Sequence, residues 1–378
     1  MNKSALPTPC TLVDEGKLRK NIEEAQAVCN RNGKALMPMT KTHKSSYIAK
    51  LQMEAGAAGL LVGSILEAER FALLAPKHIT FAYPFLGERN LMRMRKIGEK
   101  TSIAVSVDTL ETASIYHAFC KKNGLKWDYF LLVDVGLHRF GVDPEQAGKY
   151  VREIASAYPN LSFIGIASHP GQVYAATSLE RVAACFRQEE TSLRRARDSV
   201  RAEGFPCGMV ASGSTPTFSR EAESGVITAV RPGNYVFYDV VQTALGTDAD
   251  RCSLTVLATI ISKRGDRKWV MDAGSKCLGL DKGAHGNSGV VGYGRVVGYE
   301  SLTVTSLSEE VGILESETPL TLSIGDRVEI IPNHSCSAAN MTSRVVLCRG
   351  DEAGGYFDVD ARETTVVMDE YLSVLQPF

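Results

Sequence analysis

The sequence predicts an α/β fold, a (β/α)8 TIM barrel followed by a C-terminal antiparallel β domain. Eight short apolar runs rich in strand-forming residues precede residue 235, and a polar or glycine-containing segment follows each run. Most of these runs are continuously apolar, which is typical of parallel strands covered on both faces. Helical periodicity separates the runs and then disappears after about residue 250. This change of pattern predicts two domains of different class.

The expected barrel strands are residues 35–40, 59–63, 79–83, 103–107, 129–133, 161–167, 208–211 and 226–230. Segments with helical character lie between them, at residues 45–55, 64–74, 109–123, 144–156 and 179–203. In the last of these, apolar residues recur at helical spacing opposite a face rich in arginine and glutamate. The seventh crossover, residues 218–224, is short for a helical connection.

The second part of the chain reads as strands joined by glycine-rich turns. The strand-like segments are residues 252–263, 268–272, 288–299, 327–332 and 344–348. We therefore expect a barrel domain at residues 1–248 and a β domain at residues 249–378, and in an alternative the first residues join the β domain.

Composition excludes several classes of function. The formal net charge of −1, without a long basic run, argues against nucleic acid or an anionic membrane as a partner. The longest apolar stretches, such as residues 254–262, are too short to span a bilayer, and residues 1–9 lack the pattern of a secretion signal. Nine cysteines without framework spacing favour reduced thiols and a cytoplasmic protein.

Polar residues follow the expected strands at the end where barrel enzymes carry their chemistry. Lys41 follows the first strand, and Ser168 and His169 follow the sixth. The seventh strand ends in "SGSTP" (212–216) and the eighth in "RPGN" (231–234). Turns with glycine and hydroxyl side chains at these two positions are typical of a phosphate site, because their backbone N–H groups can surround an anion.

A lysine beside a phosphate site suggests a Schiff base with pyridoxal phosphate. The amine reacts with an aldehyde only when it is neutral, which requires partial burial or a neighbouring cation. Lys41 follows an apolar strand and has His43 and Lys44 close by in the sequence. Strand alternation favours Lys41 as the inward residue, with Lys44 at the start of the next helix. The alternative is that both lysines are solvated surface residues.

A second candidate site is "IIPNHSC", residues 330–336. If the strand continues through this segment, His334 and Cys336 project to the same side. An imidazole and a thiolate suit zinc, and two protein ligands leave positions open for water and substrate. The pair therefore indicates a catalytic metal. The alternative is a buried cysteine beside a solvated histidine.

The sequence resembles the D-threonine aldolase and D-serine dehydratase family, pyridoxal-phosphate enzymes of the alanine-racemase-like fold. The resemblance extends over nearly the whole chain. It rests on eight ordered segments, "KTHKS" (41–45), "DVGLHRFGV" (134–142), "SHPGQVY" (168–174), "GSTPT" (213–217), "RPGNYVFYD" (231–239), "DAGSK" (272–276), "SEEVGIL" (308–314) and "PNHSC" (332–336).

The resemblance implies roles for particular residues. Lys41 would carry the cofactor, Arg139 would contact its phenolate oxygen, His169 would stack near its ring, and Tyr174 would line the site. The phosphate would be bound by Ser212, Gly213, Ser214, Thr215, Gly233 and Asn234. His334 and Cys336 would hold a divalent metal near the substrate hydroxyl, zinc by preference, with manganese or magnesium as alternatives. The family usually forms homodimers.

The implied activity is that of a lyase acting on a small β-hydroxy D-amino acid. The His-x-Cys pair favours elimination of water, as in D-serine dehydratase, to give a 2-oxo acid and ammonia. Retro-aldol cleavage to glycine and an aldehyde is the alternative, and an amino-acid racemase or a non-catalytic cofactor carrier is less favoured. Met39 and Val311 stand where the family usually has histidines, so a natural substrate other than serine or threonine stays open.

Overall fold

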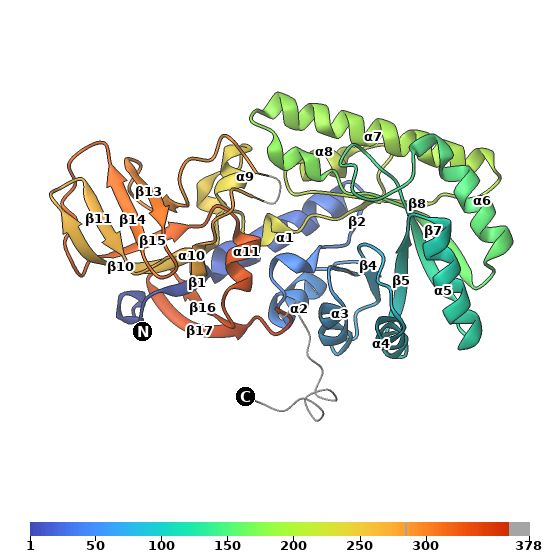
Figure 1. The fold of residues 1–378 in the computed structure, drawn as a ribbon, viewed down its shortest axis with the longest axis horizontal. Helices are drawn as coiled ribbons and strands as arrows, with labels where there is room; N and C mark the ends of the chain where they lie inside the picture. Colours follow the sequence, from blue (N-terminus) through green and yellow to red (C-terminus); the bar gives the residue numbers. More distant parts are fainter. Residues whose placement is uncertain (284–285, 363–378) are drawn as a thin grey trace.

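The computed structural model describes residues 1–283 and 286–362, which form two sheets. Figure 1 shows the two sheets at opposite ends of an elongated molecule, with helices covering the sheet that forms the barrel. The barrel strands are β2 (Ala35–Leu36), β3 (Leu60–Val62), β4 (His78–Phe81), β5 (Ser102–Val107), β6 (Trp127–Leu132), β7 (Leu161–Ala167), β8 (Met209–Ser212) and β9 (Ala229–Val230).

All neighbouring barrel strands are parallel, in the order β2-β9-β8-β7-β6-β5-β4-β3. A parallel bridge between Met39 and Leu61 joins the two outer strands and closes the barrel. The predicted fold class is confirmed. Each predicted strand is present, although β2 and β9 are much shorter than expected.

The helices of this part are α1 (Glu15–Arg31), α2 (Ser46–Glu54), α3 (Ile65–Ala72), α4 (Glu88–Gly98), α5 (Leu110–Lys122), α6 (Ala147–Ala157), α7 (Leu179–Ala202), α8 (Phe218–Glu223) and α9 (Val240–Ala244). Side-chain caps fix several of their starts, because the hydroxyls of Ser64, Thr109 and Ser178 each accept a first-turn N–H group. Helix α8 is as short as the sequence indicated. Helices α1, α4 and α9 were not predicted.

The second sheet contains β10 (Leu254–Arg264), β11 (Lys268–Met271), β12 (Arg295–Val296), β13 (Leu302–Leu307), β14 (Gly312–Ser316), β15 (Arg327–Ile331), β16 (Arg344–Arg349) and β17 (Glu352–Asp358). Strand β1 (Cys10–Asp14) also belongs to this sheet, where it pairs antiparallel with β10 and parallel with β16. The first strand of the chain therefore lies among strands from its last third.

One sequence expectation for this part is wrong. Of the expected strand 288–299 only β12 forms, because Gly292, Gly294 and Gly298 have positive φ values that turn the backbone out of an extended path. The condition under which His334 and Cys336 would project from one strand, that the strand continues through residues 334–336, is not met. Helix α11 (Ser335–Asn340) begins there, with His334 as its N-cap residue. Helix α10 (Ser275–Leu278) is the other short helix of this part.

Short 3₁₀ turns complete the description, at η1 (Lys3–Ala5), η2 (Thr40–Thr42), η3 (Pro144–Gln146), η4 (Gly171–Ala175), η5 (Asn234–Val236) and η6 (Ala249–Arg251). Within the described ranges, no helix has the length and apolar character needed to cross a membrane.

The largest core cluster contains residues of both parts of the chain. It includes Trp127 and Tyr129 of the barrel together with Leu254, Val345 and Phe357 of the second sheet. The barrel interior is a separate small cluster that contains four alanines and Phe130.

Candidate active site

A cavity of about 760 Å³ lies where the barrel meets the β domain. It is lined by loops that follow the barrel strands and by helix α11 of the β domain. Every residue proposed from the sequence lines this cavity except Ser212 and Thr215, so the lining includes Lys41, Arg139, His169, Tyr174, Gly213, Ser214, Gly233, Asn234, His334 and Cys336. The fold thus brings the proposed lysine and the proposed metal ligands to one place.

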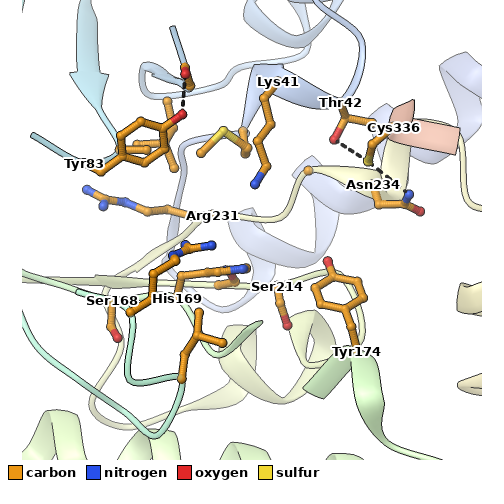
Figure 2. Close-up of a pocket in the computed structure, with 18 of the residues that line it drawn as sticks. Lys41, Thr42, Tyr83, Ser168, His169, Tyr174, Ser214, Arg231, Asn234 and Cys336 are labelled. Atoms are coloured by element: carbon orange, nitrogen blue, oxygen red, sulfur yellow. Dashed lines mark hydrogen bonds between the residues drawn. The ribbon is translucent and has the colours of Figure 1, made fainter. Parts of the chain in front are cut away.

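Lys41 and Lys44 have different surroundings. The Lys41 amine points into the space bordered by Tyr83, Asn234 and Cys336 (Figure 2). Burial lowers the pKa of Lys41, and the Arg139 guanidinium lowers it too, against the raising effect of the Cys336 and Glu67 charges. Lys44 is buried, and its amine lies 3.6 Å from Glu67 Oε1. Lys41 is therefore the lysine of this pair that is placed for chemistry.

The buried carboxylate of Glu67 organises the loop that carries Lys41. It accepts hydrogen bonds from the Thr40 hydroxyl at 2.7 Å, the Gly63 amide at 3.0 Å and the Ser64 hydroxyl at 3.0 Å. His43 lies on the other side of this loop, fully buried, with its ring bonded to Gln52. Burial lowers the pKa of His43 to about 3, so its ring is neutral and structural.

The turns that follow β8 and β9 are pressed against each other. A Cβ atom added at Gly213 would lie 2.5 Å from the backbone nitrogen of Arg231, so only glycine fits there without a backbone shift. A Cβ atom at Gly233 would lie 2.9 Å from Thr42 Oγ1. This close backbone packing is typical of turns that approach an anion.

Several polar groups of these turns already have protein partners. The Ser214 amide donates to Glu221 at 3.1 Å, and the Thr215 hydroxyl accepts from the Tyr235 amide at 3.1 Å. The Asn234 amide group donates to Asp239 at 2.6 Å and to Ser335 at 2.9 Å. The side chain of Asn234 is therefore directed at the β domain, and a contact with phosphate would use its backbone.

His169 and Tyr174 lie close together in the cavity lining, which also includes Arg139. His169 Nδ1 lies 2.9 Å from the Gly213 carbonyl, and the His169 and Tyr174 ring centroids are 6.4 Å apart. On another wall Tyr83 stacks on Phe140 and donates its hydroxyl to the Gly63 carbonyl.

Arg231 is a functional candidate that sequence reasoning missed, because it was considered only as part of a glycine turn. Its guanidinium is buried 4.5 Å above the Phe130 ring, and within the described residues its Nε and Nη2 atoms have no hydrogen-bond partner. Burial lowers its pKa to about 9. A buried guanidinium without an acceptor at the edge of a cavity indicates an acceptor-bearing ligand.

His334 and Cys336 face each other across the first turn of α11. Burial opposes a charged imidazole, but the Cys336 thiolate and Asp281 raise the pKa of His334 to about 11. Burial likewise opposes the thiolate, and the His334 charge outweighs it, so the pKa of Cys336 is lowered. Cys336 Sγ also lies 3.3 Å from the hydroxyl oxygen of Thr42.

The chemistry of this pair fits a metal ion. His334 Nδ1 lies 3.0 Å from Asp281 Oδ1, which leaves Nε2 for the cavity side, the usual arrangement of a carboxylate behind a ligating histidine. Among the described residues, no group of three or more His, Cys, Asp or Glu side chains is placed to hold a metal. A metal on His334 and Cys336 would therefore take its other ligands from water or substrate.

Other contributors were not found from the sequence. Tyr83, Glu67 and Asp281 belong to none of the eight segments. Tyr83 follows β4 and Glu67 lies in the first turn of α3, positions that could have indicated them, whereas Asp281 lies in the loop after α10 without such a signal. Of the two positions that depart from the family pattern, Met39 lines the cavity and Val311 is not part of its lining. The expected loss of a polar group from the site thus applies to Met39.

Comparisons with known proteins match both parts of the chain. Residues 13–240 match the alanine racemase N-terminal domain, and residues 253–348 match a serine dehydratase domain. A D-threo-3-hydroxyaspartate dehydratase from Delftia sp. is 29% identical over 88% of this chain and 91% of its own. A D-serine dehydratase from Dictyostelium discoideum is 29% identical over 89% of this chain and 92% of its own.

A D-threonine aldolase from Arthrobacter sp. is 26% identical over 94% of this chain and 92% of its own. The solved structure of the Delftia dehydratase has a TM-score of 0.85 and 26% identity, and the alignment covers 94% of this chain and 98% of that one. These relatives are enzymes, which argues against the alternative of a non-catalytic carrier. The chain belongs to the alanine racemase N-terminal domain family, as one of its pyridoxal-phosphate-dependent lyases, together with D-serine dehydratases, D-threonine aldolases and 3-hydroxyaspartate aldolases and dehydratases.

Proposed function

We propose that this protein is a metal-dependent dehydratase that converts a β-hydroxy D-amino acid, with D-serine as the reference substrate, into a 2-oxo acid and ammonia. The observation that carries the proposal is the shared cavity, which holds both the Lys41 amine and the His334–Cys336 pair. The relatives that act on D-serine and D-threo-3-hydroxyaspartate support elimination of water.

The cavity residues fit pyridoxal phosphate. The fit rests on a lysine amine that lines the cavity, a buried guanidinium without an acceptor among the described residues, and two turns packed so closely that glycine is needed at their contact. Lys41 would hold the cofactor covalently, and Arg139, His169 and Tyr174 would border its ring. Its phosphate would lie against the two turns that contain Ser212, Gly213, Ser214, Thr215, Gly233 and Asn234, of which Ser212 and Thr215 stand behind the cavity lining. When bound, pyridoxal phosphate supplies an aldehyde for the amine and a ring that accepts electron density from the substrate.

Lys41 is the proposed base for the α-proton of the substrate. Burial favours its neutral form, which is the form that can accept a proton. Arg139 adds a positive charge nearby and so acts in the same direction. The buried pair of Lys44 and Glu67 keeps the supporting loop in place while Lys41 moves between its roles.

The proposed metal ligands are His334 and Cys336, and the donor pair favours zinc over manganese or magnesium. When bound, the metal supplies a Lewis acid for the β-hydroxyl of the substrate. Asp281 orients the imidazole, and the Thr42 hydroxyl lies against the thiolate. A solved relative described as a variant dehydratase in the metal-free form supports a metal in this family.

Retro-aldol cleavage is the second candidate, because the D-threonine aldolase relative aligns over 94% of this chain. The two reactions give different products from the same substrates. The test is to incubate the enzyme with D-serine, D-threonine and D-3-hydroxyaspartate and to assay for ammonia, 2-oxo acid, aldehyde and glycine. The proposal predicts 2-oxo acid and ammonia. Formation of glycine without ammonia would overturn the dehydratase proposal.

The lysine assignment is tested by reducing the holoenzyme with borohydride and mapping the modified peptide. The label is expected on Lys41, and Lys41→Ala is expected to lose both label and activity. Lys50→Ala is the control, because Lys50 is an exposed lysine on α2. A label on any other lysine would contradict the proposal.

The metal assignment is tested by metal analysis of purified variants after dialysis. Cys336→Ala is expected to lose bound zinc, whereas Cys277→Ala, a half-buried cysteine of the same domain, is expected to retain it. Equal zinc content in the two variants would contradict the assignment.

We also propose that the protein is a cytoplasmic homodimer whose domains divide near residue 248. The nine cysteines are all free thiols, which supports a reducing compartment. The matched segments 13–240 and 253–348 leave a gap around the proposed boundary, which supports the division. Light scattering after size exclusion tests the dimer.

A further inference from the structure

Two glutamates lie behind the turn that follows β8. Glu189 belongs to α7 and Glu221 to α8, and both side chains are completely buried. They lie on the side of the turn that faces away from the cavity, since neither lines it. Completely buried glutamates are rare unless a partner compensates for the loss of water.

Glu221 is bonded directly to the turn. Its Oε1 atom accepts the Ser214 amide at 3.1 Å and also accepts the Thr217 hydroxyl in a very short hydrogen bond. The Ser214 and Thr217 hydroxyl oxygens lie 2.6 Å apart. The carboxyl group of Glu221 therefore fixes the shape of the turn from behind.

Within the described residues, Glu221 Oε2 and both Glu189 oxygens have no hydrogen-bond donor. The charge of Glu221 acts on Glu189, so the two carboxyl groups lie near each other. Ionisation of two neighbouring, buried carboxyl groups without a donor or a cation is strongly disfavoured, and a proton on the pair removes this cost.

Within the described residues, the largest influences on the pair come from groups that carry no positive charge. The groups that lie against it are Ser212 of β8, Glu190 and Cys185 of α7, Thr217 before α8, and Cys29 of α1. All of these are neutral or negative. Burial accordingly raises the pKa of Glu221 to about 8, and burial together with the Glu221 charge raises the pKa of Glu189 well above its ordinary value.

We propose that Glu189 and Glu221 share a proton and act as positioning residues for the cofactor phosphate, whose binding is linked to retention of that proton. An anion bound on the cavity side of the turn disfavours a second, buried negative charge behind the same turn. Phosphate binding therefore takes up a proton from solution whenever the free enzyme has lost it. This inference rests on the proposed function, because it takes the turn after β8 as the phosphate site.

The test uses the apoenzyme and pyridoxine 5′-phosphate, which carries the phosphate but has no aldehyde to react with Lys41. Calorimetric titrations in buffers of different ionisation enthalpy give both the affinity and the number of protons taken up. The useful range is pH 7.5–9, because the ligand phosphate, with a second pKa of about 6, is already a dianion there.

The wild-type enzyme is expected to take up a fraction of a proton near pH 8 and to lose affinity by up to about tenfold per pH unit above it. In Glu221→Gln the amide oxygen can still accept from Ser214, so binding is expected to persist without the pH dependence. In Glu189→Met, ionisation of Glu221 no longer places two buried negative charges side by side, so the midpoint of the pH dependence is expected to fall. Glu180→Gln is the control, because Glu180 is an exposed glutamate at the start of the same helix.

Lys41 titrates in every one of these proteins, so its effect cancels in the comparison. Identical pH dependence in the wild type and Glu221→Gln would overturn the inference and leave the proposed function intact. No binding of pyridoxine 5′-phosphate to the wild type at any pH would instead contradict the proposed phosphate site. Proton counting on the wild type keeps the inference testable even if a variant does not fold, because no proton uptake near pH 8 would refute it.

Discussion

Lys44 and Glu67 show how a single buried charge pair supports the reactive lysine. Lys44 adopts a positive φ of 46°, which is unfavourable for a lysine and is held here by the Glu67 contact and the surrounding loop. Both lysines line the cavity, but Lys44 is buried and its amine is held at Glu67, whereas the Lys41 amine has no such carboxylate partner among the described residues. The role of Lys44 is thus structural although it stands three residues from the proposed catalytic lysine.

Replacing Lys44 with methionine is expected to lower the free energy of unfolding by about 3 kcal/mol, because Glu67 would keep a buried charge without its cation. Denaturant unfolding followed by circular dichroism measures this. Lys50→Met is the control, since the exposed Lys50–Glu54 pair at 3.8 Å is worth less than about 1 kcal/mol. Equal losses in the two variants would show that the buried pair has no special role.

The Glu189–Glu221 pair also predicts a pH dependence of stability. The pKa of Glu221 is raised from its ordinary 4.5 to about 8 in the folded protein. The unfolded chain releases this proton near its ordinary pKa and the folded protein retains it, so the wild type loses stability as pH rises from about 4.5 to about 8. Glu221→Gln lacks this loss.

Thermal unfolding across that range is expected to show Glu221→Gln gaining melting temperature relative to the wild type as pH rises. A difference that stays constant with pH would mean that Glu221 titrates normally in the folded protein.

At the scale of elements, the proposed phosphate site is a junction of two turns. The turn after β8 and the turn after β9 meet at Gly213 and Arg231. The β domain contacts the second of these turns through α11, where Ser335 accepts a hydrogen bond from the Asn234 side chain. Because these contacts involve backbone atoms, a shift in one turn is transmitted to the other.

Gly213→Ala is expected to weaken cofactor binding by about tenfold to a hundredfold, because the added Cβ at 2.5 Å from a backbone nitrogen forces the turns apart. Fluorescence titration of the apoenzyme with pyridoxal phosphate measures this. Gly208→Ala, immediately before β8, is the control, since nothing lies within 4 Å of its added Cβ. Similar affinities for the two variants would exclude Gly213 from the site.

The sequence predicted elements better than the contacts between them. Residues 161–167 were predicted as a strand and form β7 over the same range, because a continuous apolar run reports burial on both faces. His334 and Cys336 were placed on a strand, but Ser335 begins a helix, and their proximity arises from its first turn. Arg231 could not be recognised, since the absence of an acceptor for a buried guanidinium is a property of the packing around Phe130.

At the scale of the whole molecule, the barrel and the β domain share a core. Leu254, Val345 and Phe357 pack in the same cluster as the barrel residues. Strand β1 comes before the first barrel strand in the chain and yet lies between β10 and β16. The shared core, and the presence of β1 in a sheet formed otherwise by the last third of the chain, favour a single cooperative unit over two independent domains.

The two tryptophans of the chain provide a test, because Trp127 lies in β6 of the barrel and Trp269 in β11 of the second sheet. Trp127→Phe and Trp269→Phe each leave one fluorescent reporter. We expect the two variants to unfold in coincident fluorescence and circular dichroism transitions, each somewhat destabilised by its core substitution. Two separated transitions within one variant would indicate independent domains.

The place of β1 has a consequence for the growing chain on the ribosome. Residues 10–14 are synthesised long before their neighbours in the sheet, residues 254–257 and 346–348. The strand-forming segment "CTLVD" must wait with its backbone groups unpaired until these partner strands have emerged. Completion of the second sheet therefore follows synthesis of the whole barrel, and a ribosome stalled before residue 340 would hold a chain whose first strand still lacks one of its two neighbouring strands.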